Sequence, residues 1–303
     1  MERRLANAFS QTIGYLLVLL SAAAFASSSA VAKWAYTQGF TPWTFALAVS
    51  LASLPILAPV ALRVRSRAGG PGGEPPRWAV AVHAALGGLS ALFFTVALAW
   101  LDVSLATLLV FSYPALVALG ARVVFGERMD PGQQAAVALT ALGTLLCTGP
   151  VEGRAAPVGV VLALATAVCH AAYMLLGERL LAGWDPLQAT FATEVALLVG
   201  TLALRPATVP ELLTLTPLQW GIALVTAVWA GAVPYLALLE GIRRVGASRA
   251  AIVSAAELPI ALLLGWGLMG DRLTSLQGLG ALLVGAATVL VQWPRHPVPA
   301  AGD

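Results

Sequence analysis

The chain of 303 residues is 59% hydrophobic and only 10% charged, with a mean hydropathy of +0.86. Soluble domains carry about 25% charged residues, so this sequence cannot cover a water-facing surface and indicates an integral membrane protein. Its net charge of +3 comes from basic residues scattered between apolar runs, a pattern that argues against nucleic-acid binding. The two cysteines, Cys147 and Cys169, each lie inside an apolar run and offer neither a disulfide framework nor a metal site.

The first 33 residues resemble a signal peptide, with a basic start, an apolar stretch and the sequence Ala24-Phe25-Ala26. We nevertheless expect this segment to be retained as the first membrane span. Its uncharged run continues to Lys33, about 20 residues beyond Gly14, which is long enough to cross a bilayer.

Apolar runs of bilayer length predict an all-α membrane protein with ten transmembrane helices. We place them near residues 12–34, 42–62, 78–100, 103–126, 131–149, 157–181, 186–204, 217–240, 247–269 and 274–292. The one long polar connection, residues 63–77, is rich in Gly and Pro and reads as a loop, not a domain. No extramembrane catalytic domain fits this layout.

The placement of basic residues predicts the orientation of these spans. A cytoplasmic N-terminus puts thirteen arginines on the inner side and leaves Lys33, Arg154, Arg205 and Arg272 on the outer side. Because cytoplasmic loops are enriched in Lys and Arg, both termini are expected in the cytoplasm.

Three landmarks recur along the chain at a spacing of 144 or 145 residues: Pro42 and Pro186, Pro114 and Pro259, and the pairs Glu127-Arg128 and Asp271-Arg272. They divide the chain into two halves of five spans, residues 1–150 and 151–303. Because five is odd, the second half enters the membrane inverted, an arrangement that recurs in transporters with alternating access. The alternative is chance similarity among helices rich in Ala, Leu and Gly.

The landmarks lie in "SLATLLVFSYPALVALGARVVFGERMDPGQQAAVALTALGTLL" and "ASRAAIVSAAELPIALLLGWGLMGDRLTSLQGLGALLVGAATVL". With this repeat, essentially the whole chain resembles the EamA-type branch of the drug/metabolite transporter superfamily. The second copy departs by having Asp271 in place of Glu and one residue fewer after the proline. Members of this family export amino acids and other metabolites, and the bacterial aromatic-amino-acid exporters are the most similar in length and character. The resemblance therefore implies a multi-pass protein of the bacterial inner membrane.

Polar or interrupted positions at mid-depth mark the candidate transport site. We expect one cavity between spans 1, 3, 4, 6, 8 and 9. The predicted substrate contacts are Ser28, Phe93, Phe94, Tyr113, His170, Tyr173, Trp229, Tyr235 and Glu257. The predicted hinges are Gly87 and Gly88, which are expected to interrupt span three, and Pro114, Pro234 and Pro259. Pro114 and Pro259 are also open to the simpler interpretation of a tolerated helix bend.

Glu257 is the most informative of these positions, because a carboxylate at mid-bilayer costs about 2.5–3.5 kcal/mol on insertion scales. It is expected to hold a substrate ammonium group or to take up a proton, with a neutral structural glutamate as the alternative. Glu194 lies at similar depth in span seven, which we expect to be peripheral, so a structural hydrogen bond is predicted there. His170 remains open between a substrate contact or proton relay and a local hydrogen bond.

The remaining features are expected to be structural. The Glu127-Arg128 and Asp271-Arg272 pairs are predicted to fix turns at opposite membrane faces. Gly278, Ala281, Gly285 and Thr288 form a small-residue face on span ten, which would pack span ten on span five or form a dimer contact. Monomer and homodimer both stay open.

The function expected from these features is secondary export of small metabolites, most simply amino acids and possibly aromatic ones. The sequence has no G-x-x-x-x-G-K-[ST] motif for ATP, and neither cofactor nor metal is expected. Export of drugs or other metabolites on the same fold is the alternative. A membrane-embedded enzyme is less favoured, because His83, His170 and His296 are scattered and no H-E-x-x-H occurs. A receptor gains no support from an even number of spans.

Overall fold

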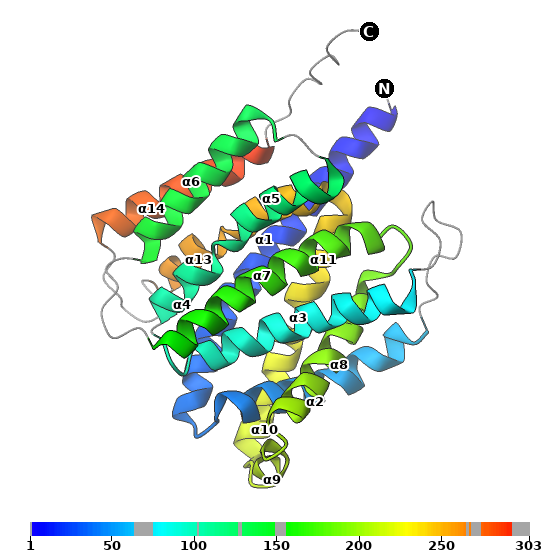
Figure 1. Ribbon diagram of the computed structural model, residues 1–303, viewed down its shortest axis with the longest axis vertical. Helices are drawn as coiled ribbons and strands as arrows, with labels where there is room; N and C mark the ends of the chain where they lie inside the picture. The colour runs from blue at the N-terminus through cyan, green and yellow to red at the C-terminus, as the bar shows by residue number, and fades with distance from the viewer. Residues whose placement is uncertain are drawn as a thin grey trace.

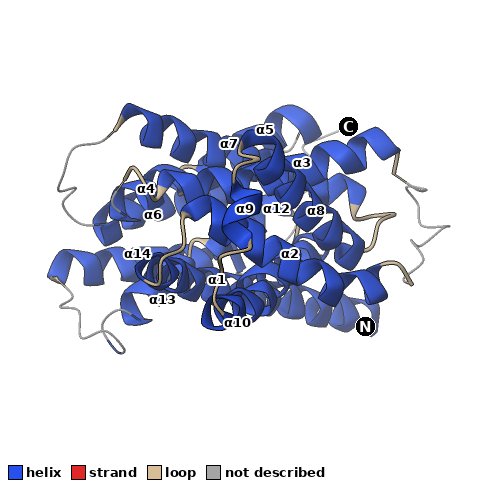
Figure 2. Ribbon diagram, turned by 90° about the horizontal axis from the view of Figure 1, so that it is seen from below, coloured by secondary structure: helices blue, strands red, loops and turns tan. Residues whose placement is uncertain are grey.

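The protein is a bundle of helices in the computed structural model, which describes residues 2–63, 75–101, 103–126, 129–148, 156–264, 267 and 274–292. None of these residues forms a β-strand, as the ribbon coloured by secondary structure shows (Figure 2). The landmark pairs Glu127-Arg128 and Asp271-Arg272 lie outside the described residues. The first turns of α1 and the last turns of α14 lie toward the same end of the bundle, opposite α9 (Thr208–Leu212) (Figure 1).

The helices follow the predicted apolar runs closely. The first half of the chain forms α1 (Glu2–Thr37), α2 (Pro42–Ala61), α3 (Arg77–Ala97), α4 (Val103–Val110), α5 (Tyr113–Phe125) and α6 (Pro131–Thr148). After α7 (Pro157–Leu180), α8 (Pro186–Leu204) and the short α9, the second half forms α10 (Pro217–Thr226), the π-helix η1 (Ala227–Ala232), α11 (Val233–Val245), α12 (Ala247–Ser254), α13 (Glu257–Leu264) and α14 (Ser275–Gln292).

Helix starts are set by proline preceded by a capping residue. Thr41 accepts a hydrogen bond from the amide of Thr44 before Pro42, and Asp185 accepts one from the amide of Leu187. Proline suits the first helical turn, where its missing N–H has no intrahelical acceptor, while the capping oxygen satisfies a neighbouring amide. The same combination opens α10, where Thr216 and Gln219 form a capping box.

Three of the predicted spans contain a break between two α-helices or a π-helical turn beside the predicted hinge prolines. Pro114 lies in the first turn of α5, two residues after the break that follows α4, and Pro259 lies in the first turn of α13 after the break at residues 255–256. Pro234 is the second residue of α11, which follows the π-helix η1 directly. Each proline removes a backbone donor and crowds the preceding turn, which accounts for the positions of the breaks.

The predicted interruption of span three at Gly87 and Gly88 is wrong, because α3 runs through both glycines as one α-helix. They instead allow close packing on α8. A Cβ atom added to Gly88 would lie 2.6 Å from the backbone nitrogen of Leu197, and one added to Gly87 would lie 2.7 Å from Thr193 Cγ2. A small residue is therefore required at a helix crossing. Movement about these glycines during transport stays a prediction.

Packing between the two halves of the chain comes in matched pairs. Helix α1 packs on α11 and α7 packs on α3; likewise α7 packs on α4 and α5, and α1 packs on α12 and α13. Helices α2 and α8 pack on each other, as do α6 and α14, which lie side by side at one edge of the bundle (Figure 1). Exchanging each helix with its counterpart 144 or 145 residues away preserves these contacts, as a two-fold relation between the halves requires.

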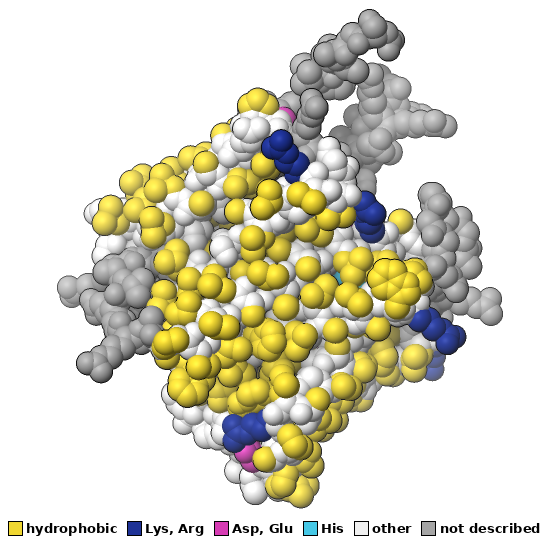
Figure 3. All heavy atoms as spheres, viewed as in Figure 1, with side chains coloured by type: hydrophobic (Ala, Val, Ile, Leu, Met, Phe, Trp, Pro, Cys, Tyr) yellow, Lys and Arg dark blue, Asp and Glu magenta, His cyan; other side chains and the backbone are white. Residues whose placement is uncertain are grey.

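Eight helices in the described part of the chain are long and apolar enough to cross a membrane, counting α4–α5, α10–α11 and α12–α13 as single spans. The apolar helix α14 is shorter, and α6 is not among the eight. The predicted total of ten spans is therefore not established. The face shown in Figure 3 agrees with membrane insertion, because hydrophobic side chains cover its middle and charged ones lie towards its edges.

Helix α14 packs on α6 through a face different from the predicted one. A Cβ atom on Gly280 would lie 2.6 Å from the backbone nitrogen of Cys147, and one on Gly143 would lie 2.7 Å from Val284 Cγ2. Gly278 and Gly285 have nothing within 4 Å of an added Cβ. The glycines at the predicted face are thus open, while Gly280 makes the close contact.

Candidate functional site

Two adjoining cavities lie inside the bundle and share five lining residues: Phe25, Ala91, Phe94, Tyr235 and Glu257. The first, of about 100 Å³, extends along α4, α5 and α7 to Thr107, Tyr113, Thr166 and His170. The second, of about 140 Å³, extends along α1, α2, α8 and η1 to Ser28, Val49, Glu194 and Gly231. Side chains from both halves of the chain therefore enclose a common space.

Six of the predicted substrate contacts line this space. Ser28 lines the second cavity, Tyr113 and His170 line the first, and Phe94, Tyr235 and Glu257 line both. The breaks in the helices help to place them, because Tyr113 begins α5, Tyr235 lies in the first turn of α11, and Glu257 begins α13. A helix start at mid-depth directs amides, and the positive end of the helix dipole, toward the site.

Aromatic rings form much of the wall in edge-to-face contacts. The rings of Tyr113 and His170 are 4.8 Å apart at an interplanar angle of 79°, and those of Phe25 and Tyr235 are 5.3 Å apart at 90°. Such contacts are favourable for aromatic pairs and fix the orientation of each ring. The wall therefore offers rigid aromatic faces and edges to a ligand.

Three predicted contacts line neither cavity. Tyr173 is fully buried behind the wall, with its ring 6.1 Å from that of Tyr235 and 4.3 Å from that of His83. Phe93 is half-buried on α3, next to Phe94 but outside both linings. Trp229 is 44% exposed, and its Nε1–H donates a hydrogen bond to Ser27 Oγ at 2.7 Å. A ligand contact at these three residues stays a prediction.

The hydrogen bond predicted for Glu194 is present, but the expected peripheral position of this residue is wrong. Its Oε2 atom accepts a hydrogen bond from Ser53 Oγ at 2.8 Å, and the side chain is 1% exposed at the edge of the second cavity. Other lining residues not predicted from the sequence are Phe25, Ser90, Thr107, Thr166 and Ser254. Except in Phe25, the hydroxyl groups of these residues at mid-span were the available sign, yet the sequence does not show which helix face points inward.

The electrostatic character of the two cavities is acidic. Their linings contain two carboxyl groups, Glu194 and Glu257, and neither lining contains Lys or Arg. In a low-dielectric interior an unpaired carboxylate favours a cation or a proton nearby. Across the described residues no group of three or more His, Cys, Asp or Glu is placed to hold a metal ion. The space is thus suited to a ligand with a positive group and an apolar, ring-sized body.

The second cavity extends toward one end of the bundle. The second cavity meets the last part of α1 at Ala32, the first part of α2 at Phe45 and the last turns of α3 at Leu98. At the other end α1 packs tightly on α11, where a Cβ atom on Gly14 would lie 2.7 Å from Val245 Cγ1 and one on Gly241 would lie 2.5 Å from Val18 Cγ2. The end that carries α9 is therefore called the hollow end, and the end where α1 begins and packs on α11 is called the packed end.

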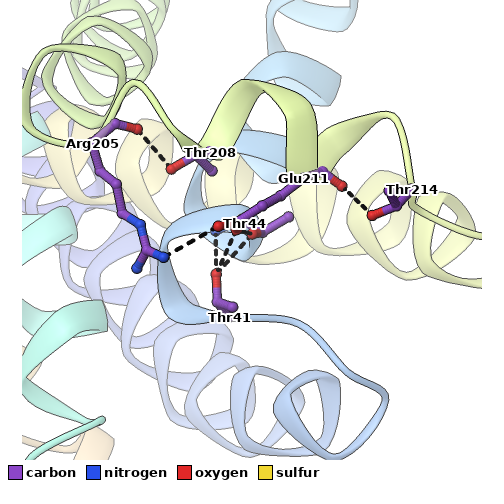
Figure 4. Close-up of polar contacts among 6 residues, drawn as sticks. All are labelled: Thr41, Thr44, Arg205, Thr208, Glu211 and Thr214. Carbon is purple, nitrogen blue, oxygen red and sulfur yellow. Dashed lines mark hydrogen bonds and ion pairs between the residues drawn. The ribbon is translucent and has the colours of Figure 1, made fainter.

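A polar cluster holds the hollow end in place (Figure 4). The Glu211 carboxylate on α9 accepts hydrogen bonds from the hydroxyls of Thr41 and Thr44 at the start of α2, and from Arg205 Nη2 at 3.2 Å. The next residues of α2, Phe45 and Ala46, line the second cavity. The cluster therefore joins the segment after α8 to the helix that forms this part of the cavity wall.

A second polar contact lies at the packed end, beside a polar hollow of about 340 Å³ whose lining includes Asp130, Glu178 and Arg249. The Oε2 atom of Glu178 on α7 accepts a hydrogen bond from the backbone amide of Ala247 at 2.6 Å. The preceding residue, Gly246, has a φ of +84°, which L side chains rarely adopt. This contact pins the sharp turn between α11 and α12 to a helix of the same half, opposite the Glu211 cluster.

Comparison with known proteins identifies the fold and the family. The sequence profile of the EamA-like transporter family matches residues 12–149 and again residues 157–293. The chain is 27% identical over 277 residues to an uncharacterized transporter, YcbK, of Bacillus subtilis (strain 168), with 88% of each chain covered. A solved crystal structure shares the fold with a TM-score of 0.70 at 18% identity, covering 93% of this chain and 95% of the other. The protein is a multi-pass membrane transporter, not an enzyme, and it belongs to the EamA-like transporter family.

Proposed function

We propose that this transporter exports small amphipathic metabolites, with amino acids, and aromatic ones among them, as its substrate class. The observation that carries the proposal is the shared space between the halves, which joins aromatic rings to carboxyl groups and is lined by neither Lys nor Arg. Glu257, which lines both cavities, takes the substrate ammonium group as a charge-assisted hydrogen-bond acceptor. Phe94, Tyr113 and Tyr235 take the apolar part, where ring contacts are favourable.

The arrangement of the two halves supports alternating access as the proposed mechanism. The hollow end and the packed end are built from corresponding helices, so exchanging the packing of the halves would open one end and close the other. In the proposed orientation, with ten spans and both termini in the cytoplasm of a bacterial inner membrane, the cavities face outward. The helix breaks at Pro114 and Pro259 supply positions where each half can bend.

Export of drugs or other metabolites is the second candidate, because the aromatic wall also fits apolar cations. The two candidates differ in what the site requires. An amino acid places an ammonium group and a carboxylate side by side, whereas a hydrophobic cation has no carboxylate.

Counterflow in proteoliposomes distinguishes the two candidates. Vesicles containing purified transporter are loaded with an unlabelled compound and diluted into a trace of the labelled one, using tryptophan, phenylalanine, leucine, alanine and ethidium in parallel. We expect transient accumulation of labelled tryptophan or phenylalanine above that in protein-free vesicles. Exchange of ethidium without any amino acid would replace the proposed substrate class with apolar cations. Exchange of none of the five compounds would refute both candidates.

A further inference from the structure

Glu194 presents a carboxyl group to the cavity without a cationic partner. The side chain is 1% exposed, lies on α8 at mid-helix, and lines the second cavity together with Glu257. Its one hydrogen bond among the described residues comes from the neutral hydroxyl of Ser53, at 2.8 Å to Oε2. A buried carboxyl group supported in this way is suited to binding and releasing a proton, because no fixed positive charge holds it ionised.

The π-helix brings its backbone unusually close to this carboxyl group. A Cβ atom added to Gly231 in η1 would lie 3.2 Å from Glu194 Oε1, closer than ordinary van der Waals contact. Gly231 is itself a lining residue of the second cavity. Widened π-turns inside α-helices often mark functional positions, and here the π-helix ends two residues before Pro234. Protonation or ionisation of Glu194 would therefore occur next to a helix segment whose backbone is already irregular.

The titratable groups around Glu194 are few. Tyr235 of α11 and Glu257 of α13 line the same cavity, and Tyr173 of α7 lies behind its wall. The residues that α1, α2, α3 and η1 contribute to this lining are not titratable, and no Lys or Arg is among them. Two carboxyl groups thus share one cavity, which favours the entry of a single positive charge, either a proton or an ammonium group.

We propose that Glu194 is the proton-carrying residue of transport, while Glu257 contacts the substrate; this inference rests on the proposed function. When substrate has left toward the outer side, the Glu194 carboxylate accepts a proton from hydronium of the outer solution, which leaves as water, and becomes a neutral carboxylic acid. After the bundle has reopened inward, the O–H bond breaks and the proton passes to water on the cytoplasmic side. One proton enters for each substrate exported, and no other reactant is consumed.

The test separates driven transport from exchange. Proteoliposomes with an acidic lumen, diluted into neutral buffer with the membrane potential clamped by potassium and valinomycin, are supplied with labelled tryptophan, phenylalanine and leucine. In wild-type vesicles, proton efflux drives substrate uptake above equilibrium. We expect Glu194→Gln to reduce this accumulation at least about tenfold while counterflow stays within about twofold of wild type, because exchange needs no net proton movement. Glu240→Gln is the matched control, since Glu240 pairs with Arg243 and Arg244 and lines neither cavity.

The other outcomes are equally informative. Accumulation by Glu194→Gln within about twofold of wild type would overturn the inference, as would wild-type counterflow with no gradient-driven accumulation. Loss of both activities in Glu194→Gln would also overturn it, because the residue would then serve binding or folding. Absence of counterflow in wild type would refute the proposed function instead. Ser53→Ala is a second variant that keeps the carboxyl group, and we expect it to retain counterflow while changing the pH dependence of driven transport.

Discussion

Replacing Gly280 with alanine tests the close packing of α14 on α6. The new methyl group would lie 2.6 Å from the backbone nitrogen of Cys147 and 2.7 Å from the carbonyl oxygen of Gly143, whereas ordinary contact begins at 3.4 Å. Backbone atoms cannot rotate away, so the helices must separate locally by the difference between 2.6 and 3.4 Å. Overpacking of this kind costs about 1–3 kcal/mol, which exceeds or offsets the gain of about 1 kcal/mol expected from replacing a helical glycine by alanine.

The same helix supplies matched controls. Gly278 and Gly285 have nothing within 4 Å of an added Cβ, so alanine there should keep the favourable helix term. Unfolding free energies are measured by SDS titration of the purified protein in mild-detergent micelles. We expect Gly280→Ala to be less stable than either control by about 1–3 kcal/mol. A Gly280→Ala variant as stable as Gly278→Ala would refute the contact between α6 and α14.

Three further predictions concern other parts of the bundle. Gly88→Ala should lower the unfolding free energy by about 1–3 kcal/mol in the same assay, because its methyl group would meet the Leu197 backbone at 2.6 Å; an unchanged value would contradict the α3–α8 crossing. Glu211→Gln should lower the unfolding free energy by at most about 1 kcal/mol, since Arg205 and Glu211 are partly exposed. A larger decrease would contradict this weak contribution of the ion pair. Trp229→Phe should change the substrate concentration that gives half-maximal counterflow by no more than about twofold, since Trp229 lines neither cavity. A tenfold change would indicate that Trp229 contacts the ligand.

The positions of the helices could be read from the sequence because lipid imposes a length on each apolar run and proline marks the breaks. Prolines 42, 186 and 217 each begin a helix, and Pro114 and Pro259 each follow a break in one. Glycine was the less reliable guide. A Gly87-Gly88 pair can interrupt a helix or allow a neighbour to approach, and only the position of α8 shows that it does the second.

The inward face of each span was harder to predict, because side chains that meet lipid and those that meet other helices are both apolar. Trp229 and Tyr235 lie in the same rod, yet one is 44% exposed and the other lines both cavities. Helical spacing likewise selected a small-residue face on α14 that includes Gly278 and Gly285, whereas the contact with α6 is made at Gly280.

Acidic residues gave the clearest sign of the site, since their cost in a bilayer demands a cavity or a partner. Glu257 was identified in this way and lines both cavities. Glu194 carries the same chemical sign, but its helix was expected at the periphery. Glu194 lies at the second cavity because α8 packs against α2, α3 and α11. This packing cannot be predicted from the residue pattern of one span.

The most direct test of the proposed substrate site is tryptophan counterflow by wild type and Glu257→Gln in parallel, with Glu240→Gln as the control. Removing one partner of a buried charge pair typically costs about 2–5 kcal/mol, which corresponds to at least about a tenfold loss. We therefore expect Glu257→Gln to exchange subsaturating tryptophan at least about tenfold more slowly than wild type, and Glu240→Gln to match wild type. Exchange by Glu257→Gln at the wild-type rate in both acidic and alkaline buffers would contradict the assignment of this cavity as the substrate site.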